Sequence, residues 1–397
     1  MPDIHLVRDG EKERDDDHLK RRIRQHRLSY VRSGLVVAAV LAVICLIVYV
    51  RYRLRVYDTC AVVDAVDMKV GASSSFQTIG NSLLWYGKDG AGCIDSAGKS
   101  VWNITYDMQT PVTVVAGKTG AICDKGGSVI YLFSEDKPLT EIECLKPVSR
   151  VAVSEGGFVA AVMDESDVTW IYLYDETGGE IARFKATMQA SGYPVSVAVS
   201  PTGKLVAVSY LSVKGDETQT DVAFYNFGGV GQNETDNLVS GYNYKDIVAP
   251  VLRFVSEDTC VAVSDTRIMF YKGAEKPVSI GESIISDEIR SVYFGDGCAG
   301  LVFESTEAGQ SYRLDVYGGS GNLTFSHDFS IDYKDILLRN GYVYIYNETD
   351  CIITTGTGRL KYNGNLGVGT KVLIPSPSSI RKLTLYGEGR TYTGELR

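Results

Sequence analysis

The sequence predicts an all-β domain, a β-propeller of eight four-stranded blades with seven as the alternative, preceded by a single transmembrane helix. Three observations predict it. Residues 34–50 carry no charge. After Tyr57, no stretch of ten or more residues has helical spacing, whereas many short runs of β-forming residues are broken by Gly, Asp and Ser. These runs recur at the length of a propeller blade.

The apolar run GLVVAAVLAVICLIVYV, Gly34 to Val50, is bracketed by Arg32 and Arg51. As a helix it is about 26 Å long, enough to span a bilayer. A cleaved signal peptide is disfavoured because its charged leader would be 33 residues long and no small-x-small site follows the run. A lipoprotein site at Cys45 is disfavoured because Ile44 fills the position where a small residue is expected. We therefore expect a membrane anchor.

Charge flanking the apolar run indicates its orientation. Six Lys and Arg precede it between Lys20 and Arg32, and three Arg follow it between Arg51 and Arg55. This difference favours a cytoplasmic N-terminus. Residues 1–33 then form a charged cytoplasmic tail, with the mixed run at 11–17 and the basic segment at 20–27, and residues 51–57 form a juxtamembrane linker. The reverse orientation stays open because of the three arginines after the span.

The large domain, residues 58–397, is acidic. It holds 28 Lys and Arg against 42 Asp and Glu. Binding to a phosphate backbone rests on basic surface, so nucleic acid is not expected as a partner. The acidic balance also keeps the domain soluble and away from an anionic membrane.

A self-comparison of residues 58–397 gives the predicted innermost strand of each blade. The positions that mark these strands are Phe76, Val114, Val151, Val197, Phe254, Val292, Leu337 and Val372. Too few residues follow Val372 for a full blade, and residues 59–66 are a strand candidate without a hairpin partner. Pairing that strand with the last ones would close the ring and remove an open sheet edge. Seven blades remain the alternative if Val372 belongs to an outer strand.

Three segments carry a resemblance to propeller families. Residues 91–102, AGCIDSAGKSVW, resemble the blade signature of quinoprotein-like (PQQ-like) propellers. The resemblance implies that Trp102 docks the first blade on its neighbour and that Asp95, Gly98 and Lys99 form the turn. Residues 171–184 are a weaker copy with Phe184 in place of the Trp, and residues 197–209 are similar to the inner hairpin of WD40-like and TolB-like propellers.

The whole arrangement of basic tail, single span and propeller resembles single-pass membrane proteins of unknown function from clostridial and related Gram-positive bacteria. In those proteins the propeller is an ectodomain outside the cell membrane. The resemblance covers the large domain, and no motif within it specifies an activity.

The residues that usually carry catalysis or metal binding are sparse. His327 is the only histidine after the span, and we expect it to be a solvated residue in an outer strand of the sixth blade. Paired cysteines and the CxxC spacing of a zinc or redox site are both missing. No catalytic, cofactor-binding or metal-binding residue is therefore predicted, and no cofactor.

Seven single cysteines are scattered through the predicted strands, at positions 60, 93, 123, 144, 260, 298 and 351. We expect most of them to be small buried hydrophobes, with room for one inter-strand disulfide. The longest repeat contains a polar stretch, Ser212 to Gly241, that is either a recognition loop or a surface insertion.

The first functional hypothesis is a non-enzymatic propeller that acts as an interaction scaffold or ligand sensor at the cell envelope. Its N-terminus is expected in the cytoplasm and its propeller outside the cell, facing a protein or envelope component. The alternative is a carboxylate- or calcium-dependent enzyme of glycan hydrolase or lactonase type, with its site at the central funnel. A third hypothesis reverses the topology and makes the propeller an intracellular assembly platform.

Overall fold

The computed structural model describes residues 32–51, 53–68, 70, 74–165, 168–188, 191–387 and 389–397. The chain divides into two compact units, Met1–Val56 and Tyr57–Arg397. The tail residues 1–31, with the basic segment at 20–27, lie outside the described residues.

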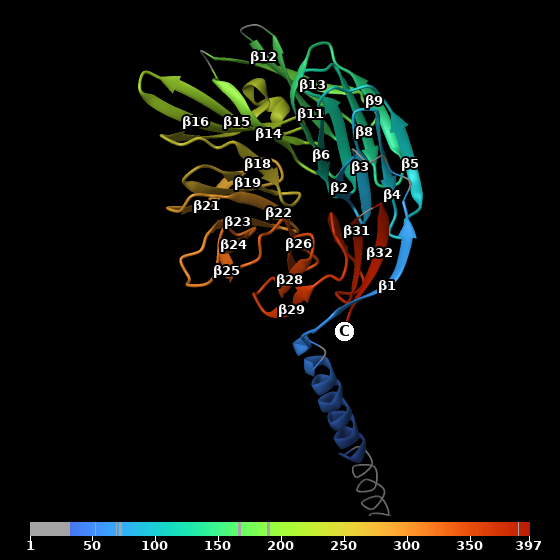
Figure 1. The fold of residues 1–397 in the computed structure, drawn as a ribbon. Helices are drawn as coiled ribbons and strands as arrows, with labels where there is room; N and C mark the ends of the chain where they lie inside the picture. The colour runs from blue at the N-terminus through green and yellow to red at the C-terminus, as the bar shows by residue number, and fades with distance from the viewer. Residues whose placement is uncertain are drawn as a thin grey trace, which may run out of the picture. The chain divides into compact units, whose positions relative to one another are not determined.

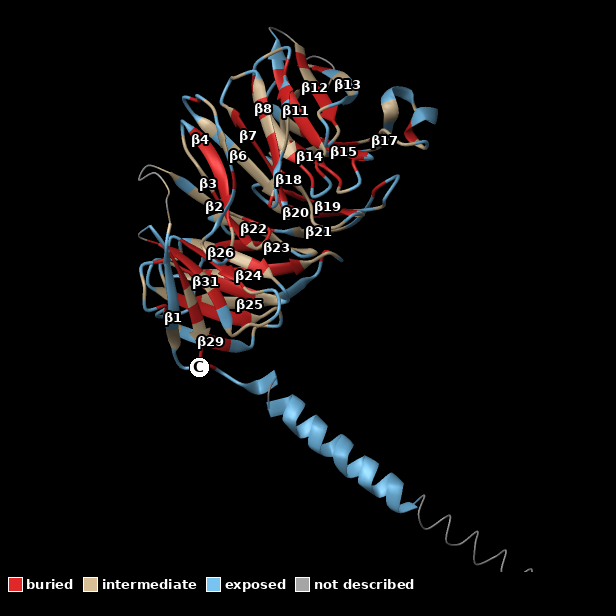
Figure 2. Ribbon diagram, turned by 90° about the vertical axis from the view of Figure 1, so that its right-hand side faces the viewer, coloured by how far each residue is buried: buried red, intermediate tan, exposed pale blue. Residues whose placement is uncertain are grey.

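In the described part of the first unit, the helix Arg32–Arg51 is long and apolar enough to cross a membrane. All its side chains are exposed, as the pale blue colour in Figure 2 shows. The helix includes the predicted apolar run and one arginine at each end. A helix satisfies every backbone hydrogen bond within itself, which is what a segment surrounded by lipid requires.

The second unit is built of antiparallel four-stranded sheets arranged around a common centre (Figure 1). Blades one to four are β2 (Ser75–Ile79), β3 (Ser82–Tyr86), β4 (Gly90–Ile94), β5 (Ser100–Thr105); β6 (Pro111–Ala116), β7 (Thr119–Asp124), β8 (Val129–Ser134), β9 (Pro138–Glu143); β10 (Val148–Val153), β11 (Val159–Glu165), β12 (Val168–Tyr174), β13 (Glu180–Thr187); and β14 (Tyr193–Val199), β15 (Leu205–Lys214), β16 (Glu217–Asn226), β17 (Leu238–Lys245).

Blades five to eight are β18 (Val251–Phe254), β19 (Thr259–Val263), β20 (Arg267–Lys272), β21 (Val278–Ile284); β22 (Ser291–Gly295), β23 (Cys298–Glu304), β24 (Tyr312–Gly318), β25 (Leu323–Phe329); β26 (Asp335–Arg339), β27 (Tyr342–Tyr346), β28 (Asp350–Thr355), β29 (Leu360–Asn365); and β30 (Val372–Pro375), β31 (Lys382–Gly387), β32 (Arg390–Leu396), β1 (Cys60–Asp67). In each blade the first strand named lies nearest the centre.

The predicted repeat is confirmed. Each of the eight marker positions, from Phe76 in β2 to Val372 in β30, lies in the innermost strand of its own blade. The alternative of seven blades is wrong, because Val372 belongs to the inner strand of the last blade rather than to an outer strand.

Ring closure uses both ends of the domain, as predicted. β1 pairs antiparallel with β32, with Cys60 opposite Leu396 and Ala65 opposite Tyr392. The register shifts between Val62 and Asp64, which leaves one bulged residue on β1. The eighth blade therefore takes three strands from the C-terminus and its outermost strand from the start of the domain, and this outer strand covers the edge of β32.

The hydrophobic core is divided among the blade interfaces. The buried residues form eight clusters, and each cluster joins one blade to the next, including one between blades eight and one that contains Tyr386 and Leu83. One blade alone would leave both faces uncovered, so the stability of the domain depends on the complete ring.

Trp102 occupies the position that the resemblance implied. It lies in the outer strand of blade one and is 7 % exposed. Its indole N–H donates to the carbonyls of Ser134 (2.9 Å) and Glu135 (3.2 Å) in blade two, and its ring packs on Phe133 with centroids 5.1 Å apart. Phe184 takes the same place between blades three and four, with its ring centroid 4.5 Å from that of Tyr225.

The turns of these two units also follow the resemblance. An Asp95 carboxylate oxygen accepts the backbone N–H groups of Ala97 and Lys99, both at 2.9 Å, and Gly98 has a φ of +78°. Asp175 makes the equivalent bonds in blade three. Aspartate fits this position because its short carboxylate reaches backbone N–H groups two to four residues further on.

Blade four contains the long polar stretch. Part of it lengthens the hairpin of β15 and β16, each of which has 10 residues. The rest forms two short 3-10 helices, η1 (Gly231–Asn233) and η2 (Thr235–Asn237), between β16 and β17. This stretch is therefore an ordered enlargement of one blade.

Candidate functional site

The centre of the ring encloses a cavity of about 700 Å³. Its wall is made by the ends of the innermost strands of blades one to seven and by the turns that follow them, such as 80–81 and 117–118. We call the side of the ring that carries these turns the turn face. We call the other side, where each outer strand leads into the next blade, the crossover face. A volume of this size is typical of small-molecule sites.

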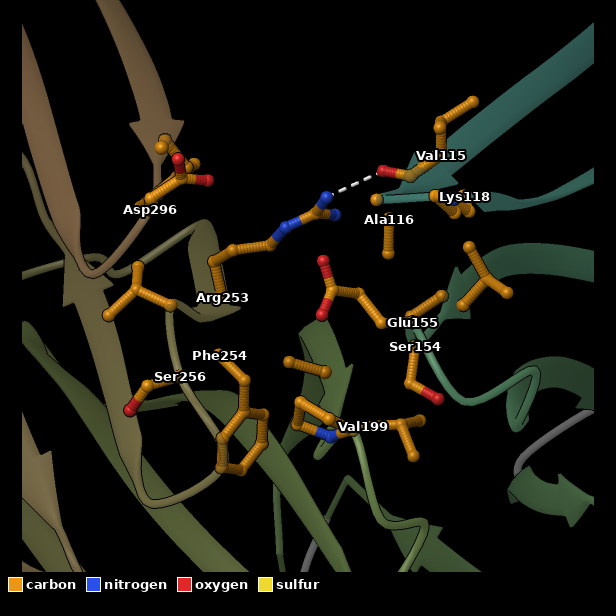
Figure 3. A pocket seen from close by; sticks show the side chains of 18 of the residues that line it. Val115, Ala116, Lys118, Ser154, Glu155, Val199, Arg253, Phe254, Ser256 and Asp296 are labelled. Atoms are coloured by element: carbon orange, nitrogen blue, oxygen red, sulfur yellow. Dashed lines mark hydrogen bonds between the residues drawn. The ribbon is translucent and has the colours of Figure 1, made fainter. Parts of the chain in front are cut away.

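Arg253 reaches into this cavity. It lies on β18 in blade five, and its Nη2 donates to the carbonyl of Val115 in blade two at 2.5 Å (Figure 3). The side chain is half-buried, and burial lowers its pKa, while the nearby Glu155 carboxylate acts in the opposite direction. Arginine remains charged at physiological pH, so the cavity contains a permanent, partly desolvated cation.

The other two basic residues of the cavity wall have partners. Lys118 forms an ion pair with Glu135 at 3.7 Å. Arg339 donates to the carbonyl of Gly80 and to the Asn81 side-chain oxygen, which ties blade seven to blade one. Arg253 has no ion pair within 4.0 Å among the described residues.

Three carboxylates line the same cavity, and each comes from a different blade. They belong to Glu155, Glu257 and Asp296. Figure 3 shows the Glu155 carboxylate directed towards the Arg253 guanidinium. Within the described ranges, no group of three or more His, Cys, Asp or Glu side chains is placed to hold a metal ion.

His327 lies in β25, the outer strand of blade six, as predicted. The expectation that it is solvated is wrong, because the side chain is half-buried. Burial lowers its pKa, and the neighbouring Asp328 only partly opposes this effect. His327 alternates along β25 with Phe325 and Phe329, so it lies on the face of the strand that packs against the core between blades six and seven.

All eight cysteines are free thiols, so the disulfide for which the sequence left room is not formed. Five are buried, at positions 93, 123, 144, 260 and 351. Burial raises the pKa of Cys93 to about 12 and those of Cys123 and Cys144 to about 11. Thiols in such surroundings stay protonated and pack as small apolar groups, which confirms the sequence-based interpretation.

The crossover face carries a set of exposed apolar side chains. The four most exposed large apolar residues described in the second unit are Leu145 (76 %), Met188 (61 %), Val213 (66 %) and Ile284 (79 %). All four lie at strand ends or loops on this face, on blades two, three, four and five in turn. We call this set the apolar rim. Sequence reasoning missed it, because only the ring order brings these four positions to one side.

Fold and site together define a class: a closed eight-bladed propeller with a central polar cavity, preceded by an apolar helix. The particular family follows from the sequence. A family of unknown function (DUF5711) matches residues 53–396, and the chain belongs to this family. No curated protein sequence matches the chain.

Several solved structures are similar to the chain over most of its length. BamB from Moraxella catarrhalis is 9 % identical, with 85 % of this chain and 100 % of that chain covered and a TM-score of 0.49. Hsv2p from Kluyveromyces lactis is 10 % identical, with 77 % and 97 % covered and a TM-score of 0.44. The Pan2 WD40 domain from Neurospora crassa is 7 % identical, with 85 % and 95 % covered and a TM-score of 0.43. The likeness is one of fold alone.

Proposed function

We propose that this protein is a membrane-anchored, non-enzymatic propeller that serves as an interaction scaffold or ligand sensor at the cell envelope of a clostridial-type Gram-positive bacterium. Residues 1–33 form its cytoplasmic tail, the helix crosses the membrane, and the propeller lies outside the cell. The helix and its flanking charges support the anchor and its orientation.

The apolar rim carries the proposal that the propeller binds a protein partner. Ion pairs lie next to two of the rim residues in the chain, Lys146–Glu165 beside Leu145 and Arg267–Glu282 beside Ile284. The charges beside these two apolar side chains are therefore already paired within the protein. A partner broad enough to cover this face would bury all four side chains and gain the hydrophobic free energy of each.

Replacing the four rim residues by serine is expected to weaken partner binding by about 100- to 1,000-fold, because each side chain contributes roughly 1 kcal/mol when buried. The measurement is cross-linking of the tagged full chain in native membranes, with quantification of the cross-linked product.

The matched control replaces four apolar residues at strand starts on the turn face, namely Leu238, Val278, Leu323 and Leu360, which are 43 %, 56 %, 51 % and 38 % exposed. This control variant should retain the product, and both variants should melt at the wild-type temperature. Equal loss in both variants, or in neither, would contradict a role for the rim.

Protease treatment of spheroplasts is expected to remove a C-terminal tag and to spare an N-terminal one, because the propeller follows the span and the basic flank precedes it. The measurement is immunoblotting of both tags before and after treatment, with detergent lysis as the control for intrinsic cleavability. Protection of the C-terminal tag in intact spheroplasts would reverse the topology and place the propeller in the cytoplasm.

A further inference from the structure

We propose that the central cavity binds a carboxylate group, and that the guanidinium of Arg253 holds it. This inference goes beyond the scaffold role, because it assigns a ligand class to a site on the opposite face from the apolar rim. It depends on neither the rim nor the orientation of the chain in the membrane.

The position of Arg253 makes its guanidinium available. The side chain extends from blade five to the far wall, where Nη2 donates to a backbone carbonyl of blade two, the only hydrogen bond of the guanidinium among the described residues. A guanidinium has five N–H donors, so most of them are left for a ligand. The bond to Val115 also fixes the direction of the side chain. The guanidinium is therefore held in place before a ligand arrives.

The energetics favour an anionic partner. A partly buried charge is costly unless it is paired and hydrogen-bonded. The only bonded partner described for Arg253 is a neutral carbonyl, and the nearby Glu155 carboxylate forms no described hydrogen bond with it. The planar fork of a guanidinium matches the two oxygens of a carboxylate and forms two parallel hydrogen bonds with it. A ligand carboxylate would satisfy donors that the folded protein leaves open.

The other residues of the cavity wall limit what the rest of the ligand can be. Val199, Phe254 and Leu338 are among the residues that line the cavity beside the charged groups. Val199 and Leu338 are only 4 % and 5 % exposed because they also pack between blades, so they leave little apolar surface for a ligand. A small carboxylate or the carboxylate end of a peptide fits a cavity of this size. The carboxylate has two sources, a free small molecule or the end of a partner's polypeptide chain.

Glu155 faces the same space and opposes binding. Its carboxylate points towards the Arg253 guanidinium (Figure 3) and is the neighbouring charge that acts on the Arg253 pKa. An incoming carboxylate must approach this negative charge at close range. Removing the Glu155 charge should therefore strengthen carboxylate binding, whereas removing the Arg253 charge should weaken it.

The test is isothermal titration calorimetry on the purified full chain in detergent. The small-molecule probes are sodium succinate and sodium hexanoate, with sodium chloride at matched ionic strength as the blank. The peptide probe is Gly-Gly-Val-Phe with a free C-terminal carboxylate, and the same peptide with a C-terminal amide is its control. We expect saturable binding of at least one carboxylate probe and none of the amide.

The variants give effects of opposite sign. Arg253→Gln should weaken binding at least about tenfold, and Glu155→Gln should strengthen it. Arg253→Lys keeps a positive charge in the cavity and should bind the carboxylate with intermediate affinity. It serves as the second variant if Arg253→Gln fails to fold. Arg290→Gln is the control. Arg290 immediately precedes β22 and is paired with Glu304, so its replacement should leave carboxylate binding unchanged.

Each outcome is decisive. Binding of the small carboxylates alone identifies a free small molecule as the source, and binding of the peptide acid alone identifies a chain terminus. Three results would overturn the proposal. The first is equal binding of the acid and amide peptides, and the second is an Arg253→Gln variant that binds the carboxylate probes as tightly as wild type. The third is that neither wild type nor Glu155→Gln binds any probe. The four-serine rim variant should bind the probes normally, so failure here leaves the scaffold role intact.

Discussion

Replacing β1 with a glycine–serine linker of equal length is expected to open the ring and lower the free energy of unfolding by about 3–5 kcal/mol. This estimate counts roughly four lost backbone hydrogen bonds at about 1 kcal/mol each. The exposed edge of β32 would also become a template for pairing with other chains. The measurement is chemical unfolding of the full chain in detergent, with size-exclusion chromatography to detect association.

A side-chain control separates backbone pairing from surface chemistry. Val62 and Val63 on β1 are 39 % and 50 % exposed. Their joint replacement by threonine keeps the strand and its ladder, and should change stability by less than about 0.5 kcal/mol. If the linker variant unfolds at the same denaturant concentration as wild type, the pairing of β1 with β32 does not contribute to closure.

Trp102→Ala is expected to lower the free energy of unfolding by about 3–5 kcal/mol, the range measured for deleting a large buried aromatic residue. The substitution would empty the space between blades one and two that the indole fills against Phe133. It would also leave the carbonyls of Ser134 and Glu135 without their shared donor. Thermal and denaturant unfolding monitored by circular dichroism measures the loss.

Trp102→Phe is the matched variant. It keeps a smaller aromatic ring in the interface and removes the indole N–H together with part of the indole ring, so the expected loss is smaller than for alanine, about 1–3 kcal/mol. An alanine variant as stable as the phenylalanine variant would show that the ring itself contributes little, against the proposed docking role.

Much of the fold was predictable because each blade repeats the same local pattern. An inner strand such as β14 is an apolar run that its neighbours bury, and this run is visible in the residues themselves. The short C-terminal remainder after Val372 also predicted that the final blade borrows a strand from the other end of the domain. The eight recurring runs and the short remainder were therefore enough to count the blades and to infer closure.

The candidate site was not predictable in the same way. Arg253 stands alone in an apolar strand, PVLRFV, and a charge in such a run was the available signal. Its bonded partner Val115 is 138 residues away in the sequence. Nothing in either segment indicates that their blades face each other across the ring.

The sequence by itself determined the apolar helix, the four-stranded repeat, the eight blades, the closing strand and the turn residues around Asp95 and Asp175. These depend on hydrophobic periodicity and on short-range hydrogen bonds, which neighbouring residues encode. Only the tertiary structure decided that Arg253 and Glu155 share a cavity and that Leu145 and Ile284 share a face. Such groupings depend on ring geometry, because closing the ring brings together residues that no local pattern connects.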